Sequence, residues 1–131
     1  MKRVSSGSPY EKLFGFSRAV RIGNVIHVSG TAPMDDKGNS VHIGDAYKQT
    51  KRCLEIIAKA IGNAGGRLDQ VVRTRVYLTD ISKSDEAGRA HGEFFGDIRP
   101  ASLMMEVGGF VRPEWLVEVE AECWVGPDEK D

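Results

Sequence analysis

The ten residues from Leu116 to Val125 constrain the fold of this chain more than any other stretch. Apolar side chains alternate strictly with mostly acidic ones, which is the pattern of a β-strand with one buried face and one open face. The apolar side carries Val117, Val119, Ala121, Cys123 and Val125, and the other side carries Glu118, Glu120, Glu122 and Trp124.

Three carboxylates on one strand face repel one another unless cations, hydrogen bonds or water satisfy them. The stretch Gln70 to Thr79 reads as a second strand, in which Arg73 and Arg75 point the same way. These arginines are the obvious partners for the glutamates if the two strands are neighbours. A solvated or ion-paired sheet face therefore explains the three glutamates as a group, and at most one of them is left for a functional role.

The remaining pattern supplies more strands and two helices. Runs at 16–21 and 24–29 are joined at Gly23 as a tight hairpin, and a short strand runs over 103–107. Apolar residues at helical spacing follow Asp45, a plausible N-cap, and end at Gly65-Gly66. A second helix, which Ser82 or Ser84 can cap, runs to Phe95.

This order predicts an α+β sandwich, in which a mostly antiparallel sheet carries two helices on one face. The chain of 131 residues is long enough for one domain, 1–131, and we expect residues 1–14 to form an irregular N-terminal arm. A small sheet with one face left bare usually associates with other copies.

Composition excludes several classes of partner. The net charge of -1 gives no electrostatic reason to expect nucleic acid or an anionic membrane. The sequence has neither a membrane-spanning apolar run nor a signal-peptide core near its start, so we expect a cytoplasmic protein.

The cysteines and histidines do not suggest a metal or cofactor. Cys53 and Cys123 sit in apolar-periodic segments and read as small buried hydrophobes. The histidines His27, His42 and His91 lack ligand spacing. We expect no metal site and no cofactor.

Several segments together resemble the RidA/YjgF family of reactive-intermediate deaminases, formerly described as translation inhibitors or L-PSP endoribonucleases. The resemblance covers residues 15–125 and is carried by GNVIHVSG at 23–30, VVRTRVYLTD at 71–80, FF at 94–95, RPA at 99–101 and LVEVEA at 116–121. It implies a chorismate-mutase-like fold, a homotrimer and small-molecule clefts between neighbouring subunits.

The same resemblance suggests site residues. Glu118 matches the water-positioning glutamate of the family, and Ser29 matches its cleft serine. Phe16 stands where the family has a cleft tyrosine. Ser102 stands where the deaminase branch has an arginine that grips the substrate carboxylate, and a hydroxyl cannot supply such a forked cation.

Other side chains could bind the substrate in place of that arginine. Arg18 lies two residues from Phe16 and so on the same face of a strand, and Arg89 and His91 lie on the second helix. A surface ion pair is the simpler explanation for each arginine. For Arg18 the two explanations are balanced, because a charge inside a short apolar strand needs a partner.

Two functions fit these features, and a third is less consistent with them. The first is an enzyme acting on a small carbonyl, imine or enamine metabolite with Glu118 as general base, though not a standard 2-aminoacrylate deaminase. The second is a non-catalytic trimer that binds a ligand or a protein partner. Ribonuclease activity ranks last, because the chain has neither a basic run nor a histidine pair.

Overall fold

The alternating C-terminal stretch forms a central strand of the sheet. β6 (Val117–Trp124) lies between β3 (Val25–Thr31) and β4 (Val71–Leu78) and is antiparallel to both. The computed structural model describes residues 1–126. The other strands are β1 (Lys2–Val4), β2 (Ala19–Ile22) and β5 (Ala101–Glu106), and the order across the sheet is β1-β2-β3-β6-β4-β5.

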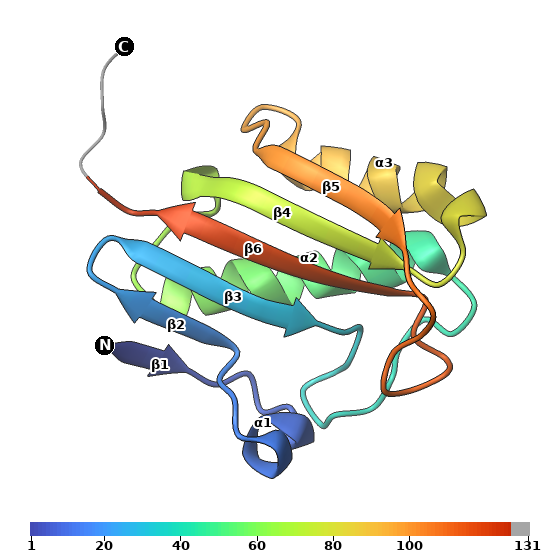
Figure 1. Cartoon of the computed structure of the whole chain (residues 1–131), viewed down its shortest axis with the longest axis horizontal. Helices are drawn as coiled ribbons and strands as arrows, with labels where there is room; N and C mark the ends of the chain where they lie inside the picture. Colours follow the sequence, from blue (N-terminus) through green and yellow to red (C-terminus); the bar gives the residue numbers. More distant parts are fainter. Residues whose placement is uncertain (127–131) are drawn as a thin grey trace.

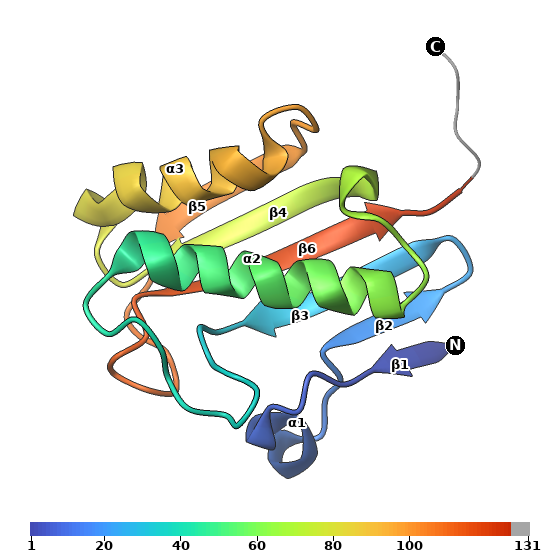
Figure 2. The same cartoon turned by 180° about the vertical axis from the view of Figure 1, so that it is seen from behind.

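The predicted fold class is confirmed. Only β5 runs parallel to its neighbour, β4, and the other strand pairs are antiparallel. α2 (Ala46–Asn63) and α3 (Ser84–Phe95) both cover the same face of the sheet, as the two opposite views show (Figure 1, Figure 2). The core lies between these helices and the apolar side of β3, β4 and β6.

The caps of the two helices differ from one another. The side chain of Asp45 accepts a hydrogen bond from the Lys48 backbone N–H, which confirms the predicted N-cap of α2. Neither Ser82 nor Ser84 caps α3, so that prediction is wrong. Asp80 instead accepts hydrogen bonds from the backbone N–H and hydroxyl of Ser82 and begins a 3₁₀ turn (Ile81–Lys83), so α3 starts from that turn without a side-chain cap.

The hairpin is confirmed, with a shorter first strand. Gly23 has φ 56°, a left-handed conformation that glycine adopts readily, between paired Ile22 and Val25. The expected strand from 16 to 21 begins only at Ala19, because the Phe16 N–H bonds back to the Glu11 carbonyl at the end of a helix.

Residues 1–14 are not an irregular arm, which corrects the expectation from sequence. β1 adds an edge strand to β2, and α1 (Pro9–Phe14) follows. Ser8 caps α1 by accepting a hydrogen bond from the Tyr10 N–H, and Pro9 occupies the first turn, where its missing N–H costs nothing. Gly15 ends the helix with φ 75°.

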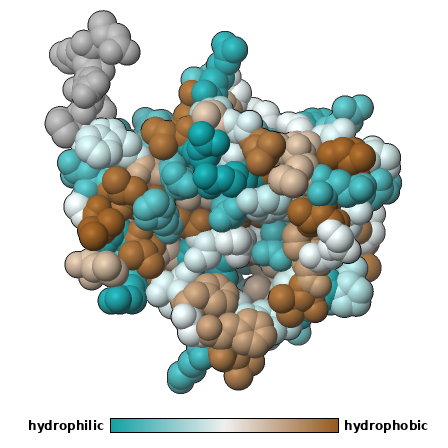
Figure 3. Space-filling view, viewed as in Figure 1, coloured by the Kyte–Doolittle hydropathy of each residue, from teal (hydrophilic) through white to brown (hydrophobic). Residues whose placement is uncertain are grey.

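The face of the sheet without helices is chemically mixed. Hydrophobic and hydrophilic side chains are interspersed on it in the space-filling view (Figure 3). Among the large apolar residues of the sheet, Leu103, Met105 and Trp124 are more than two-fifths exposed. Within residues 1–126, no helix has the length and apolar character needed to cross a bilayer.

Candidate functional site

A β-bulge creates the space around Glu118. Val28 pairs with Ala121 and Thr31 pairs with Val119, so β3 contains one residue more than β6 over this interval. The extra residue leaves Gly30 beside Glu118. A Cβ on Gly30 would lie 3.1 Å from Glu118 Oε1, so glycine is what leaves room for the carboxylate.

Glu118 lies in a small pocket with aromatic walls. The pocket has a volume of ≈ 90 Å³ and is open on the helix-free side, where Figure 3 shows a hollow next to the side chains over α1. It is lined by Ser8, Tyr10, Phe14, Phe16, Arg18, Gly30, Ala32, Met34, Val111, Trp115 and Glu118.

The pocket wall is held together by aromatic contacts. Tyr10 stacks on Phe14 with ring centroids 5.2 Å apart and meets Trp115 edge to face at 6.0 Å. The guanidinium of Arg112 lies over both Tyr10 and Trp115, 5.2 and 5.1 Å from the ring centroids. This packing joins α1 to the loop before β6.

Arg18 is 2% exposed, and two of its three guanidinium nitrogens bond to the protein. Its Nη1 donates to the Gly30 carbonyl at 2.6 Å and to Thr31 Oγ1 at 3.1 Å, and its Nε donates to Ser6 Oγ at 3.2 Å. Its Nε also lies 3.5 Å from a carboxylate oxygen of Glu11, which is itself buried. Nε and Nη1 are therefore held in structural contacts, and among the described residues Nη2 has no hydrogen-bond partner at the side of the pocket that Arg18 lines.

These surroundings alter the acidity of Glu118. Burial raises its pKa above the ordinary 4.5, the positive charge of Arg18 opposes that rise, and the negative charge of Glu120 adds to it. A carboxyl with a raised pKa exchanges a proton more readily near neutral pH than an ordinary glutamate. Among residues 1–126, Glu118 is the only acidic residue that lines this pocket.

The other two glutamates of the strand face have partners. Glu122 accepts a hydrogen bond from Arg75 Nη1 at 2.8 Å, which confirms an ion pair between the strands. Glu120 accepts a hydrogen bond from the hydroxyl of Tyr77, so the expectation that an arginine pairs with it is wrong. Arg75 lies directly opposite Glu120 in the strand register but reaches diagonally to Glu122.

Ser102 belongs to a different cluster. Thr74 donates a hydrogen bond to Ser102 Oγ at 2.8 Å, and the Thr74 oxygen also lies 2.8 Å from His91 Nε2. The direction of the hydrogen bond between Thr74 and His91 follows from the tautomer of the His91 ring. Burial lowers the pKa of His91, which favours the neutral ring.

This cluster and Glu118 occupy opposite faces of the sheet. Thr74 is buried on the helix side, whereas Tyr77, three residues along the same strand, pairs with Glu118. One chain therefore does not bring Ser102 and His91 together with Glu118.

The other residues suggested by the sequence are distributed as follows. Phe16 and Arg18 line the Glu118 pocket together, with the guanidinium 5.4 Å from the ring centroid. Ser29 adjoins the bulge, and its hydroxyl donates to the Ser17 carbonyl at 2.6 Å. Arg89 lies over the ring of Tyr47 at 4.2 Å, where α2 and α3 meet, away from Glu118.

Sequence reasoning did not identify most of the pocket wall. Tyr10, Met34 and Trp115 come from three separate segments, and only the tertiary fold brings them together. The charge pair between Glu11 and Arg18 could have been suspected, because an arginine inside a short apolar strand needs a counterion.

Two further groups of side chains bear on chemistry. Cys53 and Cys123 are buried and unpaired, and burial raises the pKa of Cys123 to about 12, so neither thiol is set up as a nucleophile. Over residues 1–126, no group of three or more histidine, cysteine or acidic side chains is arranged to hold a metal ion.

Comparison with known proteins identifies relatives along nearly the whole chain. A family model described as Endoribonuclease L-PSP matches residues 9–124. An uncharacterised protein of Streptomyces coelicolor is 41% identical over 127 residues, covering 96% of this chain and 93% of that protein. The 3-aminoacrylate deaminase RutC of Acinetobacter baylyi is 36% identical, covering 82% of this chain and 84% of that protein.

A solved structure extends the comparison to three dimensions. A Mycobacterium tuberculosis member of the YjgF/YER057c/UK114 family superposes with a TM-score of 0.85 at 45% identity, covering 95% of this chain and 98% of that one. Sequence and backbone therefore indicate the same group of proteins.

Proposed function

This chain belongs to the RidA/YjgF/L-PSP family, and from that premise we propose that it is a trimeric hydrolase of small imines or enamines. In this proposal neighbouring subunits share the clefts, and the Glu118 pocket supplies the reacting carboxyl. The observation that carries the proposal is one half-buried carboxyl with a raised pKa, set among aromatic side chains and beside a glycine.

The chemistry needs one group that takes a proton and returns it. Ionised Glu118 accepts a proton from a water molecule while the water oxygen bonds to the carbon of the C=N bond, whose π electrons move to nitrogen. The protonated carboxyl then gives that proton to the nitrogen of the resulting carbinolamine. The Glu118 carboxylate next takes the hydroxyl proton of the carbinolamine and passes it to nitrogen. The O–H electron pair becomes the C=O bond as the C–N bond breaks, so ammonia leaves and the carbonyl compound remains.

An enamine needs one step before this sequence. The carboxylic acid form of Glu118 protonates the carbon β to nitrogen, which converts the enamine into an iminium ion and leaves Glu118 ionised for the attack by water. A raised pKa supports this step, because part of the carboxyl is still protonated above pH 4.5. The same residue can therefore act as acid and then as base. The deaminase RutC, 36% identical to this chain, is named for an enamine of this kind, 3-aminoacrylate.

We further propose that this protein is a poor 2-aminoacrylate or 2-imino acid deaminase. Ser102 has no positive charge, and its hydroxyl accepts the hydrogen bond of Thr74. Arg18, the cation beside Glu118, is already bonded to Gly30, Thr31 and Ser6. Neither residue offers the bidentate grip that a substrate carboxylate favours.

The helix-free face supports the trimer. Leu103, Met105 and Trp124 are 44%, 42% and 48% exposed there, and exposed apolar groups on a sheet face are typical of association surfaces. Ser102 and Glu118 lie on opposite faces of one sheet, so a cleft that uses both of them requires two subunits. A trimer would therefore cover the exposed apolar side chains and allow Ser102 of one subunit to approach Glu118 of another.

Ammonia release tests the proposal. Purified protein is mixed with 3-aminoacrylate, with 2-iminobutyrate and with the imine that an amine oxidase makes from propylamine, and a coupled dehydrogenase reports ammonia. We expect acceleration of the propylamine-derived imine, which has no carboxylate, and weaker acceleration of 3-aminoacrylate and 2-iminobutyrate, which both carry one. Glu118→Gln should lower the accelerated rate by about 10²- to 10⁴-fold.

Glu120→Gln is the matched control for that variant. It makes the same change on the same strand face two residues away, at a carboxylate bonded to Tyr77 and outside the pocket. It should keep the rate within a few fold. If no substrate reacts faster with protein than without it, the protein is better described as a non-catalytic binding trimer.

A further inference from the structure

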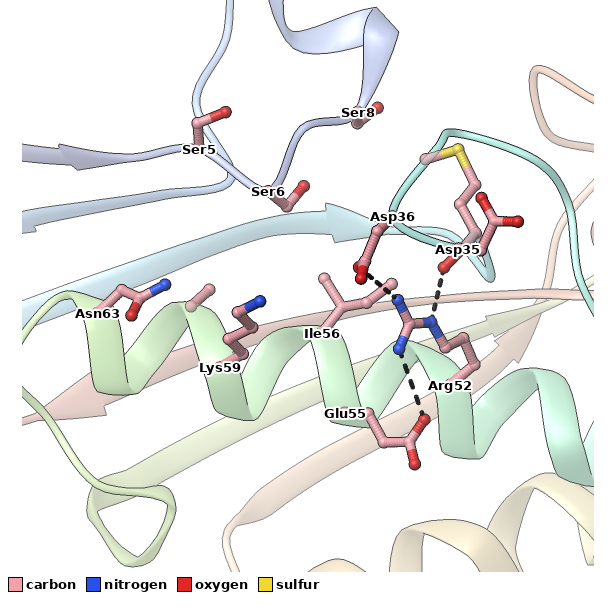
Figure 4. Close-up of a pocket in the computed structure, with 12 residues that line it drawn as sticks. Ser5, Ser6, Ser8, Asp35, Asp36, Arg52, Glu55, Ile56, Lys59 and Asn63 are labelled. Carbon is pink, nitrogen blue, oxygen red and sulfur yellow. Dashed lines mark hydrogen bonds and ion pairs between the residues drawn. The ribbon is translucent and has the colours of Figure 1, made fainter.

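A second pocket lies between the N-terminal segment and α2. It has a volume of ≈ 210 Å³, more than twice that of the Glu118 pocket. Figure 4 shows its walls: the Ser5–Ser8 stretch above, the turn at Asp35-Asp36 to one side and one face of α2 below. We refer to it as the α2 pocket.

The α2 pocket has a polar end rich in hydrogen-bond donors. Lys59 and Asn63 stand one turn apart on α2, with Ser5 and Ser6 above them (Figure 4). No hydrogen bond or ion pair occupies Lys59 or Asn63 in the described part of the chain. Ser5 Oγ accepts from the Gly7 N–H at 3.2 Å, and its hydroxyl also hydrogen-bonds the Glu11 carboxylate, so Lys59 and Asn63 are the donors at this end. This end can receive a carboxylate.

The opposite end is acidic. Asp36 and Glu55 flank Arg52, whose Nε also donates to the Met34 carbonyl at 2.6 Å, while the Asp35 carboxylate accepts hydrogen bonds from the backbone N–H groups of its own turn. Arg52 lies 3.3 Å from an Asp36 oxygen and 3.8 Å from a Glu55 oxygen. Two carboxylates share one arginine, so this end keeps a net negative charge and acceptor positions for an ammonium group.

Between the two ends the floor is apolar. Ile56 and Ala60 present hydrocarbon from α2, and the buried Met34 adds a thioether from the loop. The space equals about seven molecules of liquid water at ~30 Å³ each, which suits a metabolite of similar heavy-atom count. Drug-sized ligands use pockets of about 300–1,000 Å³, so larger molecules do not fit.

We propose that the α2 pocket binds a small α-amino acid with an apolar side chain as a zwitterion. The carboxylate lies against Lys59 and Asn63, and the ammonium lies against Asp36 and Glu55. The side chain rests on Ile56 and Ala60. A ligand with both charges fits this lining better than a simple anion, because the five charged side chains that line the pocket sum to -1.

This proposal is independent of the proposed hydrolase. The α2 pocket shares Ser8 and Met34 with the Glu118 pocket but contains neither Glu118 nor Arg18. Amino-acid binding can therefore be present whether or not the protein hydrolyses imines, and its test uses no turnover.

Calorimetric titration of the full chain with L-valine tests the proposal, with isobutylamine and isobutyrate as analogues that each lack one charged group. We expect L-valine to bind about tenfold or more tightly than either analogue. Equal affinity for isobutyrate would overturn the ammonium contact, and equal affinity for isobutylamine would overturn the carboxylate contact.

Two lysines on α2 make a matched pair of variants. Lys59→Gln should weaken L-valine binding by about tenfold, because it removes a charged donor. Lys51→Gln removes the same charge from an exposed position outside the pocket and should leave the affinity unchanged. Absence of heat and of amide shifts at Ala60 and Asn63 with millimolar L-valine would overturn the site, and so would equal weakening by both variants.

Discussion

The buried pair of Arg18 and Glu11 gives the most quantitative prediction. Arg18→Met keeps much of the side-chain length and removes the charge. It deletes hydrogen bonds of 2.6, 3.1 and 3.2 Å to Gly30, Thr31 and Ser6 and leaves Glu11 buried without its cation. Breaking one side of a buried pair typically costs 3–5 kcal/mol, so we expect the free energy of unfolding to fall by about 3–5 kcal/mol.

Three hydrogen bonds from a charged group, at about 1.5–3 kcal/mol each, would together suggest a larger loss. Methionine partly offsets this loss of stability, because folding the variant no longer requires a charged guanidinium to be removed from water. The Glu11 carboxylate also keeps its hydrogen bonds to the Ser6 backbone N–H and hydroxyl. These compensations bring the expected loss back to the range for a broken buried pair.

Urea denaturation followed by tryptophan fluorescence, at one fixed protein concentration, measures this loss. The comparison is Arg75→Met, which breaks the half-exposed pair with Glu122 and should cost about 1 kcal/mol or less. In a double-mutant cycle, Glu11→Gln added to Arg18→Met should cost less than it does alone. A loss below about 1 kcal/mol for Arg18→Met, or additive losses in the cycle, would refute the account of Arg18 as a structural cation.

Three further predictions concern the proposed function. Ser102→Arg should increase ammonia release from 2-iminobutyrate by about tenfold while Ser102→Ala does not; strong activity of the unchanged protein would contradict the missing-cation argument. The hydrolysis rate should fall as the pH is lowered through a Glu118 pKa above 4.5. Burial makes the pKa of Glu118 higher in the folded protein than in the unfolded chain. The unchanged protein should therefore lose stability relative to Glu118→Gln as the pH rises through the folded-state pKa of Glu118. Identical pH profiles of stability for the two proteins would contradict the raised pKa. Light scattering should report three chains per particle at micromolar concentration, and a monomer would remove the basis for shared clefts.

The strands and helices were predictable where side-chain periodicity is strong. The alternation of β6, the β-branched run of β4 and the apolar stripe of α2 each identified their element within a few residues. Residues 1–14 were not predictable in this way. A three-residue edge strand and a helix of six residues are too short to show a period, and only the Ser8-Pro9 step gave a local signal.

Three of the residues named from the sequence, Phe16, Arg18 and Glu118, line one pocket. Glu118 was singled out by the family resemblance, but its surroundings depend on a bulge that leaves no pattern in the sequence. The register places Arg75 opposite Glu120, yet Glu120 bonds diagonally to Tyr77 and Arg75 bonds diagonally to Glu122. The aromatic wall depended on contacts between segments about a hundred residues apart, such as Tyr10 and Trp115.

The pairing of Glu11 with Arg18 also has an evolutionary consequence. The acid lies on α1 and the base lies just before β2, yet neither is easily tolerated in the core without the other. Positions 11 and 18 should therefore covary among relatives, with a neutral residue at one accompanied by a neutral residue at the other. Lineages that change this pair should also diverge at Ser6, the neighbour that bonds to both side chains.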